Sequence, residues 1–165
     1  MNSFIELNNM ALSRFSAEER SHIGIHTCCG GDRDTSHADA VDYASLMPFL
    51  FALKATHFYI ELAGEKDKRR VLGSIRNSIK PEQRVFVGVV SPMESRIETA
   101  EEVRDRVLEA AEYIPVAQLG TTDDCGFAPF SDDIFATRET AFEKIRIRVA
   151  GTGRATATLG VLHAG

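Results

Sequence analysis

The sequence predicts an α/β fold with a parallel sheet. Three observations predict it: short runs of apolar and β-branched residues recur along the chain, a helix-like stretch follows each run, and no internal repeat or low-complexity stretch interrupts the alternation. A strand, a helix and a further strand form a right-handed crossover, so successive strands lie parallel. An open α/β sandwich and part of a (β/α)₈ barrel both accept this order, and in both the chemistry gathers at the carboxyl ends of the strands.

Four segments have the composition of strands, because they are short and rich in apolar and β-branched residues. The run Arg-Val-Phe-Val-Gly-Val-Val is the clearest buried strand among them. The predicted strands comprise residues 22–28, 57–63, 84–90 and 117–122. A helical segment follows each strand, which gives four β/α units.

The helices are predicted from their start and stop signals. Ser16 and Thr99 each open a capping box of the form Ser/Thr-x-x-Glu, and Pro81 is a stop signal after a helix. Pro48 lies within a predicted helix, which we expect it to bend or break. The predicted helices cover residues 4–14, one turn after residue 16, 41–54, 67–79, 99–113 and 134–149.

The composition is that of an ordinary globular protein with one domain, which we expect to span residues 1–165. Hydrophobic residues make up 44% and charged residues 26% of the chain. The net charge of −5 without a basic block argues against nucleic acid as a partner. Apolar runs fall well short of the about 20 residues that cross a bilayer, and the first ten residues lack the pattern of a signal peptide. We therefore expect no membrane association and a cytoplasmic location.

Chemically versatile side chains stand at the ends of three predicted strands. His26 and Cys28 lie two residues apart at the end of the first strand, so they project to the same side. Glu61 stands at the end of the second strand, and Cys125 follows the fourth. Neighbouring parallel strands lie about 4.8 Å apart, so these groups can converge. Imidazole nitrogen and thiolate sulfur are the ligands that zinc prefers, with a carboxylate as an acceptable fourth, which predicts a zinc site with one displaceable ligand.

Each of these residues also has a plainer interpretation. A cysteine such as Cys125 is often a small buried hydrophobe, a lone His-x-Cys spacing has low specificity, and a glutamate at a strand end is often a surface residue. The three cysteines are an odd number, and a reducing compartment disfavours a disulfide framework. The agreement among three strand ends is what favours the metal.

Weaker candidates lie beside the predicted ligands. The Gly-rich loop after the first strand contains Asp32 and Arg33, which either hold an anionic substrate or are the solvated charges of a turn. This loop lacks the pattern of a phosphate-binding P-loop. Ser91, which follows the third strand, is a candidate for substrate contact. Asp123 and Asp124 either orient a metal ligand or cap the following turn.

Three segments carry a resemblance to a known family. They read IGIHTCCGG at residues 23–31, FYIELAGE at 58–65 and LGTTDDCGF at 119–127. These segments resemble the catalytic barrel of cobalamin-independent methionine synthase, most of all the stand-alone methionine-synthase-II-like proteins, a group that includes epoxyalkane:coenzyme M transferase. The resemblance implies a partial TIM barrel, formed by the last four βα units of a (β/α)₈ barrel.

The resemblance also implies a zinc ion bound by His26, Cys28, Glu61 and Cys125, which match the positions of the family's ligands. The implied reaction is transfer of a methyl or alkyl group to a thiol, so the implied partners are a small-molecule thiol and an alkyl donor. Zn²⁺ in such a site binds the acceptor thiol, lowers its pKa and presents a thiolate nucleophile. Glu61 would be the ligand that the substrate sulfur displaces.

Two departures from the family pattern bear on activity. A complete barrel needs about 250 residues, and the resemblance covers only the last four units, so we expect a homodimer or a complementing half-barrel to cover the sheet edges and the inner face. Val90 stands where methionine synthases have a proton-shuttling histidine within an Asp-Ile-His-Ser-Pro stretch. The alternative function is therefore a truncated, catalytically inert zinc-binding paralogue, or a half-barrel that needs a partner chain.

Overall fold

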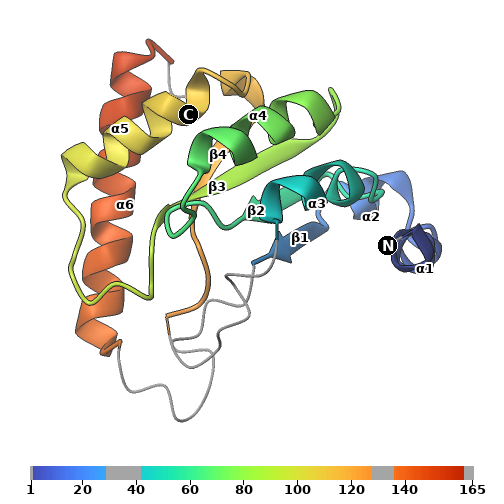
Figure 1. Cartoon of the computed structure of the whole chain (residues 1–165), viewed down its shortest axis with the longest axis horizontal. Coiled ribbons are helices and arrows are strands. Elements are labelled where there is room, and N and C mark those ends of the chain that lie inside the picture. Colours follow the sequence, from blue (N-terminus) through green and yellow to red (C-terminus); the bar gives the residue numbers. More distant parts are fainter. Residues whose placement is uncertain (1, 29–41, 128–135, 162–165) are drawn as a thin grey trace.

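The computed structural model describes residues 2–28, 42–127 and 136–161 and shows a parallel four-stranded sheet (Figure 1). The strands are β1 (Gly24–Thr27), β2 (His57–Ile60), β3 (Arg84–Val90) and β4 (Leu119–Asp123), in the spatial order β1-β2-β3-β4. Every pair of neighbouring strands is parallel, which confirms the predicted α/β fold. Strands β1 and β2 are shorter than predicted, because the chain leaves the sheet just before Cys28 and Glu61.

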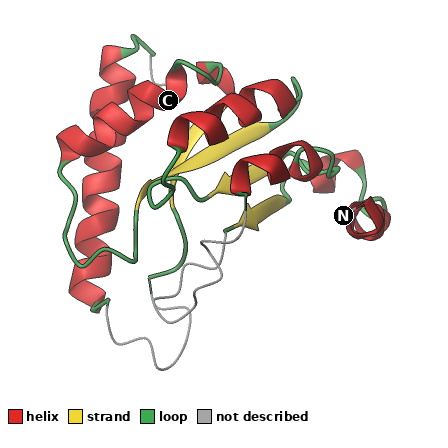
Figure 2. Cartoon of the chain, viewed as in Figure 1, coloured by secondary structure: helices red, strands yellow, loops and turns green. Residues whose placement is uncertain are grey.

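Helices connect the strands in the order that the sequence predicts (Figure 2). Their bounds are α1 (Asn2–Leu12), α2 (Ala17–Arg20), α3 (Tyr43–Leu50), α4 (Lys68–Ser78), α5 (Ala100–Ala111), the short 3-10 helix η2 (Val116–Gln118) and α6 (Arg138–Thr158). Both predicted capping boxes are present, so local sequence determines where α2 and α5 begin. Within the described ranges, no helix has both the length and the apolar character needed to cross a membrane.

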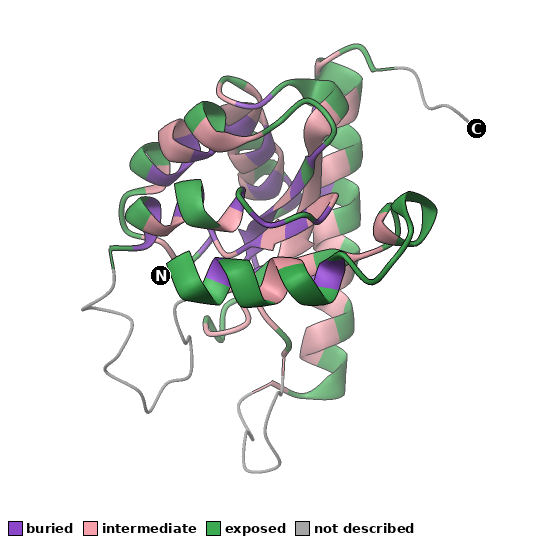
Figure 3. Cartoon of the chain, turned by 90° about the vertical axis from the view of Figure 1, so that its right-hand side faces the viewer, coloured by how far each residue is buried: buried purple, intermediate pink, exposed green. Residues whose placement is uncertain are grey.

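The core lies between the sheet and the helices that follow its strands. Alternate residues of β2 and β3, such as Phe58, Ile60 and Val87, are completely buried and pack against apolar residues of the helices. The ring of Phe51, just after α3, lies 4.7 Å from that of Phe58. Figure 3 shows buried residues gathered along the sheet and on the inward sides of the helices, whereas α1 is largely exposed. Burial of this apolar face holds the helices against the sheet.

The other face of the sheet, here called the open face, carries half-buried aromatic rings. Tyr59 of β2 and Phe86 of β3 are paired in register, and their rings stack with centroids 4.7 Å apart. The rings lie across the two edge strands, which carry glycines there. A Cβ at Gly24 would meet Tyr59 Cε2 at 2.5 Å, and one at Gly120 would meet Phe86 Cδ1 at 2.3 Å. The open face is therefore aromatic and defined by these four residues.

Helix α3 is shorter than the predicted segment, residues 41–54, and Pro48 lies inside it. Proline has no amide hydrogen, so the carbonyl of Ala44, four residues earlier, lacks its helical partner. The hydroxyl of Ser74 in α4 donates to this carbonyl at 2.8 Å. The neighbouring helix thus satisfies the group that Pro48 leaves open, and α3 continues through the proline to Leu50.

Helix α6 differs from its predicted range, residues 134–149, at both ends. It begins after Thr137, whose side chain accepts the amide of Thr140, and residues 134 and 135 lie outside the described part of the chain. It continues past Gly151 to Thr158. A Cβ at Gly151 would lie 2.5 Å from the Cβ of Val103 in α5. This glycine allows the two helices to approach closely, and α6 continues through it.

Candidate metal centre

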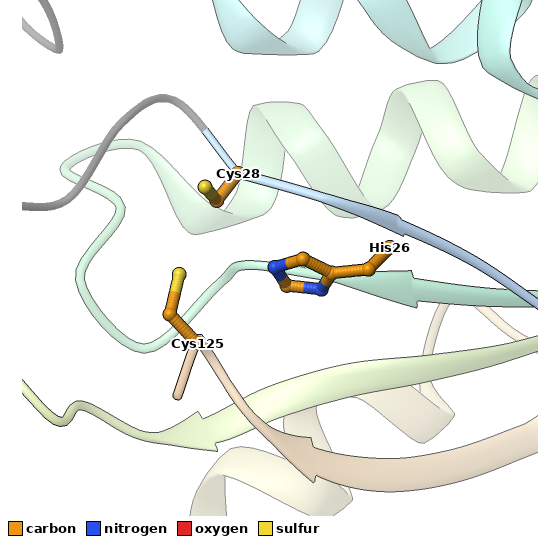
Figure 4. A group of neighbouring side chains, drawn as sticks. All are labelled: His26, Cys28 and Cys125. Atoms are coloured by element: carbon orange, nitrogen blue, oxygen red, sulfur yellow. The ribbon is translucent and has the colours of Figure 1, made fainter. Parts of the chain in front are cut away.

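Three of the predicted ligands meet at one point beyond the carboxyl ends of the strands. The donor atoms of His26, Cys28 and Cys125 all lie within 4.8 Å of one another. His26 belongs to β1, Cys28 directly follows it, and Cys125 lies two residues past the end of β4. Figure 4 shows the three side chains pointing into the same space.

The meeting of these residues is notable because β1 and β4 are the two edge strands of the sheet. Three strand spacings would separate the edges of a flat sheet by roughly 14 Å. The twist of the sheet and the residues beyond the strand ends close this gap, so that Cys125 reaches the His26–Cys28 pair. The open face forms the concave side of this arrangement, as the inner face of a barrel would.

The donor set and its spacing fit zinc. Both cysteines are free thiols, with Cys28 exposed and Cys125 half-buried, so an ion has access to the site. Zn–S bonds of about 2.3 Å place two sulfurs of a tetrahedral site roughly 3.8 Å apart, so the three donors need to move by only about 1 Å. One imidazole and two thiolates leave a fourth position for another ligand.

The electrostatics of the cluster also favour a cation. Burial raises the pKa of the Cys125 thiol, and the neighbouring Cys28, Glu61 and Asp124 raise it further. Each of these neighbours makes deprotonation of Cys125 less favourable by repelling the negative charge of its thiolate. A divalent ion bound between them would reverse this effect, because metal binding deprotonates coordinating thiols.

Glu61 is not one of the three residues whose donor atoms gather within 4.8 Å of one another. It follows β2 directly and is half-buried. Its carboxylate contributes to the raised pKa of Cys125, and its Oε1 lies 3.5 Å from the position that a Cβ on Gly64 would occupy. Its role as the fourth ligand stays a prediction.

Asp124 ties the Glu61 loop to the Cys125 loop. Its carboxylate accepts the backbone amides of Leu62 and Ala63 at 2.8 Å and that of Gly64 at 2.7 Å. Burial raises the pKa of Asp124 to about 6, although the three amides act in the opposite direction. Gly88 of β3 leaves room for this carboxylate, since a Cβ there would lie 1.7 Å from Asp124 Oδ1. Asp124 thus positions the two segments that carry Glu61 and Cys125.

The remaining predicted site residues have different surroundings. Asp123 faces α6, where Arg148 Nε donates to its Oδ1 at 3.1 Å; burial raises the pKa of Asp123 and Arg148 lowers it. Ser91 is buried just after β3, and its backbone is held by Glu98 and Lys144. Asp32 and Arg33 lie outside the described residues.

Sequence reasoning missed Glu98 and Lys144. Both are almost completely buried and form an ion pair of 2.8 Å beside Ser91. In the sequence, Glu98 stands next to a capping box and Lys144 stands within a charged helix, where both resemble solvated residues. Only the packing of α6 against the segment before α5 reveals the pair.

Comparisons with known proteins agree with this architecture. The family described as "Cobalamin-independent synthase, Catalytic domain" matches residues 7–149. An uncharacterized protein of Bacillus subtilis (strain 168), YxjH, is 25% identical over 124 residues, which cover 75% of this chain and 32% of that protein. The chain therefore spans about a third of the length of this curated relative.

A solved structure shows the same fold. It is that of a B12-independent methionine synthase from Shewanella sp. W3-18-1 in complex with selenomethionine, with a TM-score of 0.66, 21% sequence identity, and coverage of 84% of this chain and 40% of that chain. The likeness confirms the predicted partial TIM barrel. From the family match and the shared fold, the chain belongs to the cobalamin-independent methionine synthase family, of whose catalytic domain it forms a part.

Proposed function

We propose that this chain is the zinc-carrying part of an enzyme that transfers a methyl or alkyl group to a small-molecule thiol, and that residues 1–165 form one domain. The observation that carries the proposal is the meeting of one imidazole and two thiols within 4.8 Å, in a member of a methionine synthase family. The similar Shewanella protein is a methionine synthase, which supports the same class of reaction.

In this proposal His26, Cys28 and Cys125 hold the ion and Glu61 is the exchangeable fourth ligand. Bound zinc supplies the positive charge that lowers the pKa of a substrate thiol and keeps its sulfur nucleophilic. The chain's own residues supply the placement. Asp124 fixes the loop after Glu61 by accepting three of its amides. These hydrogen bonds hold Glu61 and Cys125 in fixed positions relative to each other.

Val90 bears on the choice of substrates. It ends β3 and is completely buried, and its aliphatic side chain has no group that could carry a proton. A methionine synthase-like reaction that relies on a histidine there has no counterpart in this chain. We therefore propose an acceptor thiol or an alkyl donor different from those of methionine synthases. Free thiols at a metal site fit a reducing compartment, which is the basis for a cytoplasmic location.

The second candidate is a catalytically inert zinc-binding chain, or a half-barrel that acts only with a partner. The open face supports it, because half-buried rings on a concave sheet face are normally covered in a closed barrel. A homodimer or a complementing half-barrel would provide that cover.

Metal analysis tests the site. The chain purified without chelator should contain about one zinc per molecule by inductively coupled plasma mass spectrometry. Cys125→Ser should weaken zinc binding at least about tenfold, because a neutral hydroxyl replaces a thiolate ligand. The control His22→Gln changes an exposed histidine outside the cluster and should bind zinc as the parent does. A parent chain without zinc would contradict the proposal.

X-ray absorption at the zinc edge separates the two candidate functions. A thiol acceptor should add one sulfur to the zinc coordination and remove an oxygen. An unchanged spectrum in the presence of excess thiol would favour the inert chain. Homocysteine and 2-mercaptoethanol are suitable probes, because they share a mercaptoethyl group and only homocysteine carries an amino acid group.

A further inference from the structure

A buried ion pair lies behind the candidate metal centre and takes no direct part in it. The side chains of Glu98 and Lys144 are 0% and 1% exposed, and Lys144 Nζ lies 2.8 Å from Glu98 Oε2. Moving two charges out of water is expensive, and apolar residues of the same size are often at least as stable. The pair therefore calls for a role other than stability.

The hydrogen bonds that the pair makes to the backbone converge on the segment that follows β3. Lys144 Nζ donates to the carbonyls of Ser91 at 3.0 Å and Arg96 at 2.7 Å. Glu98 Oε1 accepts the amide of Ser91 at 2.9 Å. Arg106 lies 3.8 Å from the same carboxylate oxygen and donates to the carbonyl of Val89. Both backbone groups of Ser91 are thus held by one buried ion pair.

The hydroxyl of Ser91 faces the loop that carries Glu61. The position of a Cβ on Gly64 is 3.9 Å from Ser91 Oγ, 3.5 Å from Glu61 Oε1 and 3.4 Å from Asp124 Oδ2. Three oxygens from three strand ends therefore surround one point beside the metal cluster. In this structure Glu61 Oε1 lies near that point, and Glu61 is not one of the three residues whose donor atoms gather in the metal cluster.

We propose that Ser91 is a docking position for the carboxylate of Glu61 when a thiol takes its place at the metal, and that the Glu98–Lys144 pair is a positioning pair that fixes Ser91 for this task. The inference rests on the proposed function, because it presumes a metal with an exchangeable Glu61. The hydroxyl of Ser91 donates a hydrogen bond to the displaced carboxylate and so favours the thiol-bound state. Losing it should weaken thiol binding while leaving the three fixed ligands untouched.

The test uses the full chain loaded with Co²⁺, with 2-mercaptoethanol as the thiol, and follows both binding steps by the absorption of the metal–thiolate bond. Ser91→Ala should bind Co²⁺ within about threefold of the parent and bind the thiol at least about fivefold more weakly, because one charge-assisted hydrogen bond is lost. The double variant Glu98→Gln/Lys144→Met should show the same split. Thermal unfolding of each variant identifies any that do not fold. If the double variant does not fold, Ser91→Ala still tests whether the hydroxyl favours thiol binding.

The matched control removes an exposed ion pair from the same helix. Glu143→Gln/Arg146→Gln should leave both dissociation constants within about twofold, since these side chains are 37% and 67% exposed and pair with each other. Combining Ser91→Ala with the buried double variant should weaken thiol binding no further, because the pair acts through Ser91.

The outcomes separate the two proposals. Thiol dissociation constants that match the parent, or effects of Ser91→Ala and the buried double variant that add, would reduce the ion pair to a structural role. A parent chain that binds neither Co²⁺ nor the thiol would refute the proposed function, and the positioning role with it. Weaker Co²⁺ binding in parallel with weaker thiol binding would also contradict it, because it would show general damage to the site.

Discussion

Asp124 shows how one side chain connects two segments that lie 60 or more residues apart along the chain. Its two carboxylate oxygens accept three amides, and all three belong to the loop after Glu61. Because Cys125 is the next residue, a shift of the Asp124 carboxylate would move both Cys125 and the loop after Glu61. The precision of the site therefore depends on a residue that does not itself belong to the donor cluster.

Asp124→Asn tests this connection. The amide of asparagine replaces one acceptor oxygen by a donor, so at least one backbone amide loses its partner, which costs about 1–3 kcal/mol. Urea unfolding at neutral pH should show this loss of stability. Asp105→Asn is the control, since its carboxylate is 63% exposed and should change stability by no more than about 0.5 kcal/mol. Equal effects of the two substitutions would contradict the structural role of Asp124.

At the scale of elements, the helices depend on partners outside themselves as well as on local signals. Helix α5 begins at a capping box that its own sequence encodes, and Arg96 adds two hydrogen bonds to the glutamate of that box. Helix α3 tolerates an internal proline because α4 supplies a hydroxyl to the open carbonyl. The first arrangement is visible in the sequence, whereas the second exists only after the helices pack.

The acid stability of α5 follows from its capping box. Hydrogen bonds from Arg96 and Thr99 lower the pKa of Glu102 from 4.5 to about 2. A lowered pKa in the folded state adds stability above the ordinary pKa, and this stability is lost as the pH falls through the folded value. Between pH 4.5 and 2 the parent should therefore lose more stability than Glu102→Gln.

Urea unfolding at several pH values measures this difference. The control Glu82→Gln alters an exposed carboxyl outside the capping box and should follow the parent's pH profile. Parallel profiles for the parent and Glu102→Gln would refute the prediction.

The proline in α3 gives a second prediction at this scale. Ser74→Ala leaves the carbonyl of Ala44 without its partner and should cost about 1 kcal/mol. Pro48→Ala restores an amide for the same carbonyl, so Ser74→Ala should cost clearly less in that background. Thermal unfolding of the two single variants and the double variant gives the coupling. Additive effects would show that the hydroxyl and the proline are unrelated.

At the scale of the whole molecule, the chain has a covered face and an open face. Among the residues that the structure describes, the helices cover one side of the sheet, and the other side carries the stacked rings of Tyr59 and Phe86 against the edge-strand glycines. Closed barrels bury such a face completely. We propose that a second polypeptide segment covers the open face.

Analytical ultracentrifugation tests this completion. We expect the chain to sediment as a dimer at micromolar concentration, and Tyr59→Lys to shift it towards monomer by placing a charge on the open face. Phe142→Lys changes a residue of α6 that is 60% exposed and should leave the dimer intact. A stable, well-behaved monomer for the parent would contradict the expectation.

Much of the fold follows from local sequence, and much of the site does not. Capping boxes and apolar runs place the helices and strands, and residue types single out His26, Cys28 and Cys125 as a group. The Glu98–Lys144 pair escapes such reasoning, because it joins residues 46 positions apart through burial alone. The close approach of α6 to α5 at Gly151 escapes it for a similar reason, because this approach exists only once the two helices pack.

The placement of the donors on the two edge strands has a further consequence for folding. Cys28 and Cys125 are 97 positions apart, so an ion that binds both would cross-link a loop of more than half of the polypeptide. Cross-linking a loop of about 100 residues restricts the unfolded ensemble by about 4–5 kcal/mol in the chain-entropy treatment of disulfides. The apoprotein should accordingly unfold at lower temperature than the metal-loaded chain, with the greatest loosening where the first and last strands turn towards each other.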